Sequence, residues 1–198
     1  MKKLIIPCLL VLLISGCGKI APQLDVNKKI YNTFSNMQGY EAVLKVNTVS
    51  NTNNNTFDTK QYYKYPDKMR SETDGVVTIM EGGRATVQNT AVGQPLKIEQ
   101  IPSDESDYMF LQNFFAAYYR NEETSAVVNS DKSNIITLQV DTGLSNPYRS
   151  SAELKMDTGT MKPISMELKG KDGKTYVKIE YVSFQINQNL GDSLFQIE

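Results

Sequence analysis

Alternation of apolar and polar residues along several short segments is the feature that most limits how this chain can fold. Apolar residues at every second position lie on one face of a β-strand. The clearest segments are Ala42, Leu44 and Val46; Ile136, Leu138 and Val140; Ala152, Leu154 and Met156; and Ile164, Met166 and Leu168. This pattern is typical of an antiparallel sheet with one face on a core and the other in water.

Turn residues between these segments indicate that the strands follow one another as hairpins. Gly82 and Gly83, residues 157–159 and residues 172–173 have the composition of tight hairpin turns, and the polar run 51–55 is a hairpin loop. Further strands are predicted at 56–65, 68–73, 76–81 and 84–89. Pro66 ends the first of them because proline cannot donate a hydrogen bond to a ladder. The sequence therefore predicts one meandering sheet.

Two segments instead place apolar residues at helical spacing. The first carries Val26, Ile30, Phe34 and Met37 between an N-cap at Asp25 and a stop at Gly39. The second starts at Ser103 and carries Tyr108, Leu111, Phe114, Phe115 and Tyr118. This aromatic stripe can fill the core inside the curved sheet or line a hydrophobic cavity. A helix on a curved sheet needs such a stripe, which favours the core.

The N-terminus has the pattern of a secretory signal peptide. Two lysines precede an apolar run at 4–14, and Ser15 and Gly16 come directly before Cys17. The run is too short to span a bilayer, which needs about 20 apolar residues. We expect residues 1–16 to be removed, Cys17 to carry lipid, and 17–23 to form a tether before a single domain at 24–198. An ordinary secreted protein cut near a cysteine is the alternative.

Histidine is absent from the whole sequence, and this removes several kinds of active site. Ser-His and Cys-His pairs and the usual zinc sites need it. The acidic residues Asp104, Glu105 and Asp107 lie at a helix start, where they favourably meet the helix dipole. The sequence leaves open an active site made of two carboxylates that come together only in the folded chain. No nucleotide-binding motif is present, and without the leader the net charge of −1 becomes −3. We expect that the protein is not an enzyme and that it binds no cofactor, no metal and no nucleic acid.

The last long strand changes its apolar face near its middle. The residues concerned are Val177, Ile179 and Tyr181 on one side, and Val182, Phe184 and Ile186 on the other. A straight strand cannot bury both sets on one face. Either a bulge lies near Ser183, or the strand crosses into a second copy and gives a strand-exchanged homodimer.

Several stretches together resemble the LolA/LolB-like lipoprotein family. They are YKYPDKMR at 63–70, TIMEGGRAT at 78–86, the aromatic helix, and the closing YVKIEYVSFQIN and DSLFQIE. Tyr65, Pro66 and Arg70 match the early strand signature of the family, and Phe195 and Ile197 match its end. The resemblance implies a mainly β (α+β) fold, namely an incomplete antiparallel β-barrel wrapped around packed helices.

The whole sequence more closely resembles the spore germination lipoproteins of the GerS type. This resemblance implies a non-catalytic lipoprotein of the spore envelope that is held in the membrane by lipid on Cys17. It also implies a partner, the N-acetylmuramoyl-L-alanine amidase CwlD, whose activity in forming muramic-δ-lactam the lipoprotein supports. A LolA/LolB-like carrier of lipid or lipoproteins is the alternative. Tyr62, Tyr65 and Arg70 are the partner-binding candidates, because interfaces favour Tyr and Arg, although cross-strand pairing on the wet face is the simpler explanation.

Overall fold

The computed structural model describes residues 21–50, 53–99, 109–120, 125–128, 134–186 and 189–197. The predicted signal peptide at 1–16 and the lipidation site Cys17 therefore lie outside the described residues. The same holds for the predicted cap Ser103, for Tyr108 and for the acidic residues 104, 105 and 107.

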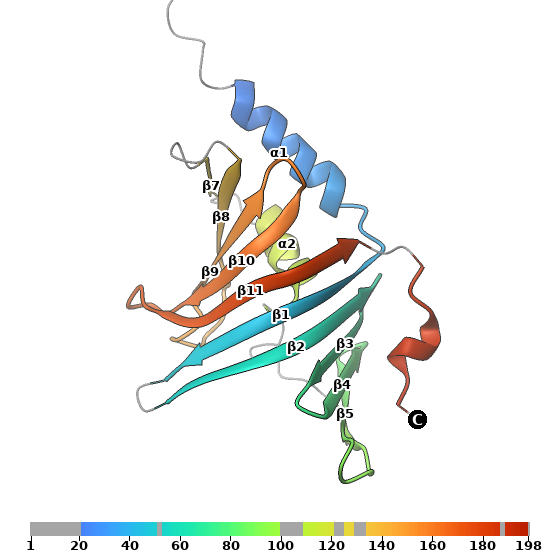
Figure 1. The fold of residues 1–198 in the computed structure, drawn as a ribbon. Coiled ribbons are helices and arrows are strands. Elements are labelled where there is room, and N and C mark those ends of the chain that lie inside the picture. The colour runs from blue at the N-terminus through green and yellow to red at the C-terminus, as the bar shows by residue number, and fades with distance from the viewer. Residues whose placement is uncertain are drawn as a thin grey trace, which may run out of the picture.

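The chain forms two α-helices, eleven strands and one short 3-10 helix within the described residues (Figure 1). The elements are α1 (Ala21–Phe34), β1 (Gly39–Val49), β2 (Asn54–Lys64), β3 (Lys68–Thr73), β4 (Val76–Glu81), β5 (Arg84–Asn89), β6 (Leu96–Ile98), α2 (Leu111–Arg120), β7 (Ser125–Val128), β8 (Ile135–Asp141), β9 (Ser151–Asp157), β10 (Lys162–Lys169), β11 (Thr175–Ile186) and η2 (Asp192–Phe195). β6 and β7 were not predicted, because each is short and lacks a clear alternating pattern.

All strands join one antiparallel sheet in the order β6-β5-β4-β3-β2-β1-β11-β10-β9-β8-β7. The first six strands form one meander and the last five another, and the pairing of β1 with β11 connects them. The order runs from β6 to β7 without closing, so the sheet is an open half-barrel. The predicted incomplete antiparallel barrel is confirmed.

The core lies between the inner face of the half-barrel and α2, with α1 at one end (Figure 1). On α2, Leu111, Phe114 and Phe115 are buried, and Tyr118 is half-buried. Phe115 stacks on Phe34 of α1 with ring centroids 4.2 Å apart, which ties the two helices together. The described part of the aromatic stripe is thus core.

The first helix differs from its prediction at both ends. Among the described residues it runs from Ala21, four positions before the predicted cap Asp25. Pro22 does not prevent this, because proline is tolerated in the first helical turn. The helix ends at Phe34, and Gly39 starts β1 instead of closing the helix. Met37 reaches the core from the connecting segment.

A bulge explains the change of face in β11. Ser183 pairs with Val43 and Tyr181 pairs with Leu44, so Val182 has no opposite residue in β1. Val182 is 68% exposed, whereas Phe184 beyond it is buried. The bulge interpretation is therefore confirmed, one residue from the predicted place. The strand-exchanged homodimer stays a prediction, because the structure describes one chain.

A second bulge, in β10, contradicts one predicted core residue. Pro163 pairs with Met156 and Ser165 pairs with Lys155, so Ile164 is the extra residue. Ile164 is 39% exposed, and Pro163 is buried in its place. The predicted alternation of Ile164, Met166 and Leu168 is wrong at Ile164, because a bulge moves the residues before it to the other face.

Candidate partner-binding site

The turn between β2 and β3 holds Tyr65 at the surface. The backbone N–H of Tyr65 donates to the carbonyl of Gln38 at 2.8 Å, and the Tyr63 hydroxyl donates to the carbonyl of Pro66 at 3.1 Å. These bonds fix both sides of the turn. Tyr65 itself remains 59% exposed, so its ring is presented to solvent from an ordered backbone.

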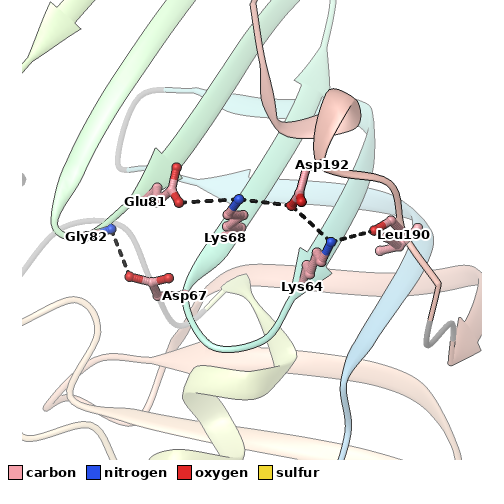
Figure 2. A network of polar contacts seen from close by, with 7 residues as sticks. All are labelled: Lys64, Asp67, Lys68, Glu81, Gly82, Leu190 and Asp192. Atoms are coloured by element: carbon pink, nitrogen blue, oxygen red, sulfur yellow. Dashed lines mark hydrogen bonds and ion pairs between the residues drawn. The ribbon is translucent and has the colours of Figure 1, made fainter.

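The C-terminal segment, residues 189–197, lies over the outer face of β2 and β3 (Figure 1). Lys64 and Lys68 are opposite residues of the two strands, and Asp192 lies between them (Figure 2). One Asp192 oxygen is 3.0 Å from each of the two Nζ atoms. Lys64 also donates to the carbonyl of Leu190 at 2.8 Å. Hydrogen bonds from Lys64 and then Lys68 hold the pKa of Asp192 below its usual range.

The same lysines connect the C-terminal segment to the next hairpin. Lys68 Nζ is 3.5 Å from a Glu81 oxygen at the end of β4, and the backbone N–H of Gly82 donates to Asp67 at 3.0 Å (Figure 2). The β2-β3 turn, the β4-β5 turn and η2 thus form one polar network. These groups are largely exposed, so each ion pair contributes little to stability.

Arg70 and Tyr62 lie beneath the C-terminal segment. Arg70 donates to the carbonyl of Leu194 at 2.8 Å and to the Glu72 carboxylate at 2.7 Å, and its side chain is 17% exposed. Tyr62 packs against a small apolar cluster outside the main core, and burial followed by the nearby Glu72 charge raises its pKa. The buried members of this cluster are Ile79, Leu190 and Phe195.

The three predicted partner-binding residues are therefore in different situations. Tyr62 and Arg70 are cross-strand neighbours that are half-buried against the C-terminal segment, whereas Tyr65 is exposed. Sequence reasoning missed Lys64, Lys68 and Asp192, although Asp192 belongs to the quoted DSLFQIE stretch. The sequence signal that could have identified them is the negative charge of Asp192, which pairs with two lysines of a distant hairpin.

A groove of about 500 Å³ adjoins Tyr62 on the outer face. It opens where the two bulged strands separate, since the pairing of β10 with β11 stops at Ser165 and Glu180. Three charged residues, Glu41, Lys60 and Lys162, line it together with apolar residues that include the exposed Val182. We take Tyr65 and this groove as the candidate surface.

The described residues hold no group of three or more Cys, Asp or Glu side chains that could bind a metal ion. The interior is filled as well: Phe110, Leu111, Phe114 and Phe115 are each at most 3% exposed.

Comparison with protein families gives a match over nearly the whole chain. The model of the YdcC-like sporulation protein family matches residues 1–195. The comparison with curated proteins gave no match.

Three solved structures share the fold. An uncharacterised conserved protein of Thermus thermophilus has 11% identity over 88% of this chain and 92% of its own, with a TM-score of 0.53. The structure of the Clostridioides difficile CwlD amidase in complex with the GerS lipoprotein matches with 20% identity and a TM-score of 0.52. The match covers 89% of this chain and 100% of the matched chain. An outer membrane lipoprotein-sorting protein domain of Vibrio parahaemolyticus has 10% identity over 87% of this chain and 95% of its own, with a TM-score of 0.50. The predicted resemblance is confirmed in fold and family.

Proposed function

This chain belongs to the YdcC-like sporulation protein family, and from that premise we propose that it binds and activates a cell-wall amidase of the CwlD type. In this proposal the protein performs no chemistry itself. It is a lipoprotein of the spore envelope that supports muramic-δ-lactam formation and so germination.

One observation carries the proposal: the chain combines membership of a sporulation family with the fold of a structure in which an amidase is bound to a lipoprotein. At 20% identity the likeness concerns the fold, so the partner is our inference. The open ring of Tyr65 and the groove beside Tyr62 supply a surface of the kind that protein interfaces use.

Anchoring through Cys17 is part of the same proposal. The small residues before Cys17 fit a lipoprotein cleavage site, and acyl chains on a cysteine bind membranes through their buried methylenes. Among the described residues no helix is long and apolar enough to cross a bilayer. We propose that the mature chain begins at Cys17 and stands outside the cytoplasm.

A carrier function would require an apolar cavity of several hundred Å³. The rings of α2 occupy the described interior of the half-barrel, and the groove of about 500 Å³ is on the outer face, with polar and apolar residues both in its lining. We therefore place partner binding ahead of lipid or lipoprotein transport.

A calorimetric titration of the amidase with the mature chain tests the binding. We expect a complex, and Tyr65→Ala should weaken it at least tenfold, since a central interface tyrosine contributes more than about 1.4 kcal/mol. Tyr148→Ala is the matched control, because Tyr148 is similarly exposed, at 51% against 59%, and should leave affinity unchanged. No heat and no co-elution with the amidase would refute the proposal.

A further inference from the structure

Two exposed tyrosines form a fixed pair where α1 meets the end of α2. Tyr31 is 55% exposed and Tyr119 is 39% exposed, and their rings meet edge to face with centroids 5.3 Å apart. Tyr119 also stacks on the buried Phe115 at 5.9 Å. The pair is thus attached to the core while its outer surface faces solvent. Amphipathic tyrosine rings are favoured at membrane-water interfaces, where one side is apolar and the other wet.

Basic side chains lie beside this pair. Lys28 precedes Tyr31 by three positions on α1, which places it on the same helix face, and Arg120 follows Tyr119 at the end of α2. Both are exposed. Such side chains attract the anionic headgroups of a bilayer and can extend their charges to the headgroup level. We call Lys28, Tyr31, Tyr119 and Arg120 the helix-end patch.

The distance from the proposed anchor selects this patch over other surfaces. Cys17 precedes the first residue of α1 by four positions, a reach of at most about 14 Å. The ten residues from Ala21 to Tyr31 rise about 15 Å along the helix. The turn between β10 and β11 lies at the opposite end of the half-barrel from α1 (Figure 1). A lipid on Cys17 therefore holds the helix end near the membrane.

We propose that the helix-end patch lies against the surface of an anionic bilayer and orients the half-barrel with α1 on the membrane. The inference rests on the lipid anchor of the proposed function. The patch is small and acts only because the anchor keeps it at high local concentration. In this orientation the β10-β11 turn points away from the membrane, and the outer face beside the C-terminal segment stays open to a partner.

The test uses two properties of the sequence. The chain has no tryptophan, and Cys17 is the only cysteine of the mature chain. The mature chain is coupled through Cys17 to maleimide-headgroup lipid in vesicles of phosphatidylcholine and phosphatidylglycerol. A single probe is then introduced as Tyr31→Trp, and its quenching by spin-labelled lipid is measured.

Tyr148→Trp is the control probe. Tyr148 is about as exposed as Tyr31, and it contacts Tyr176 next to the β10-β11 turn. We expect quenching of the Tyr31→Trp probe to exceed that of the control at least threefold, and Lys28→Gln with Arg120→Gln to reduce the difference. Equal quenching of both probes, or quenching of neither, would overturn the orientation. Because the coupled lipid replaces the natural one, this result is independent of whether Cys17 is acylated in the cell.

Discussion

The hydroxyl of Tyr181 is buried and has no hydrogen-bond partner among the described residues, and burial raises its pKa. Removing an unsatisfied buried polar group relieves its desolvation cost. Tyr181→Phe should therefore leave the free energy of unfolding unchanged or raise it by about 1 kcal/mol, as measured by urea denaturation.

Tyr40 provides the matched control for this prediction. Tyr40 is fully buried, whereas Tyr181 is partly buried, and the Tyr40 hydroxyl donates to Gln112 and accepts from the backbone N–H of Leu111, each at 3.1 Å. Tyr40→Phe should lower the free energy of unfolding by about 1–2 kcal/mol. An equal loss in both variants would mean that the Tyr181 hydroxyl is in fact satisfied.

Asp192 should make the attachment of the C-terminal segment dependent on pH. Lys64 and Lys68 lower its pKa in the folded chain. A depressed pKa contributes stability above the unfolded value of about 4, and this contribution is lost as pH falls through the folded pKa. Asp192→Asn should thus melt at a lower temperature than the parent near neutral pH and coincide with it in acid.

Two controls test whether charge causes the difference between Asp192→Asn and the parent: added salt, and a substitution of a carboxylate outside the network. Added salt should shrink the difference, because exposed ion pairs are screened. Asp58→Asn, an exposed position of β2 on the same outer face, should show no comparable change at neutral pH. A gap between Asp192→Asn and the parent that persists in acid would show that the network is not electrostatic.

The proposed lipid anchor makes a direct prediction for Cys17. Cys17→Ala removes the only side chain that can carry the acyl groups in the mature chain, so the protein should move from the detergent phase to the aqueous phase in a partitioning assay. Unchanged entry of the variant into the detergent phase would show that another part of the chain holds the membrane.

At the scale of elements, the bulge in β11 keeps Tyr181 and Phe184 on the same face. Inserting an alanine between Val43 and Leu44 would give Val182 an opposite residue, restore a regular register and turn Phe184 outward, because side chains alternate with a period of two. The insertion should lower the free energy of unfolding by about 3 kcal/mol or more, as for the loss of a buried phenylalanine. Val182→Ala should change it by less than about 0.5 kcal/mol, since Val182 is 68% exposed. Equal effects in urea denaturation would show that the bulge is not needed.

Elements with local causes were predictable from the sequence. β3, β4 and β5 have the predicted bounds. Their apolar and polar residues alternate, and the turns between them contain glycine or aspartate, so both signals lie in neighbouring residues of the chain. The strands β6 and β7 are short and lack a clear alternating pattern, and the apolar alternation around Ile164 gives no sign of its bulge, so the sequence pattern does not reveal these three features. The same holds for the site: the signature around Tyr65 was visible, whereas the cover over Arg70 depends on residues more than a hundred positions away.

At the scale of the whole molecule, three parts of the structure have different roles. The inner face of the sheet and α2 form the core, the outer face carries the C-terminal segment and the groove, and α1 connects to the proposed anchor (Figure 1). In the proposed function, this arrangement would leave the outer face available to a partner while lipid on Cys17 holds one end of the chain. A protein built in this way can position an enzyme at a membrane without catalysing a reaction.

Activity of the amidase on peptidoglycan tests this account most directly. The mature chain, a CwlD-type amidase and purified peptidoglycan are combined singly and together, and the released muropeptides are separated by chromatography. We predict no cleavage by the mature chain alone, weak cleavage by the amidase alone, and cleavage at least tenfold faster when both are present. Cleavage by the mature chain alone, or an amidase rate that the mature chain leaves unchanged, would contradict the account.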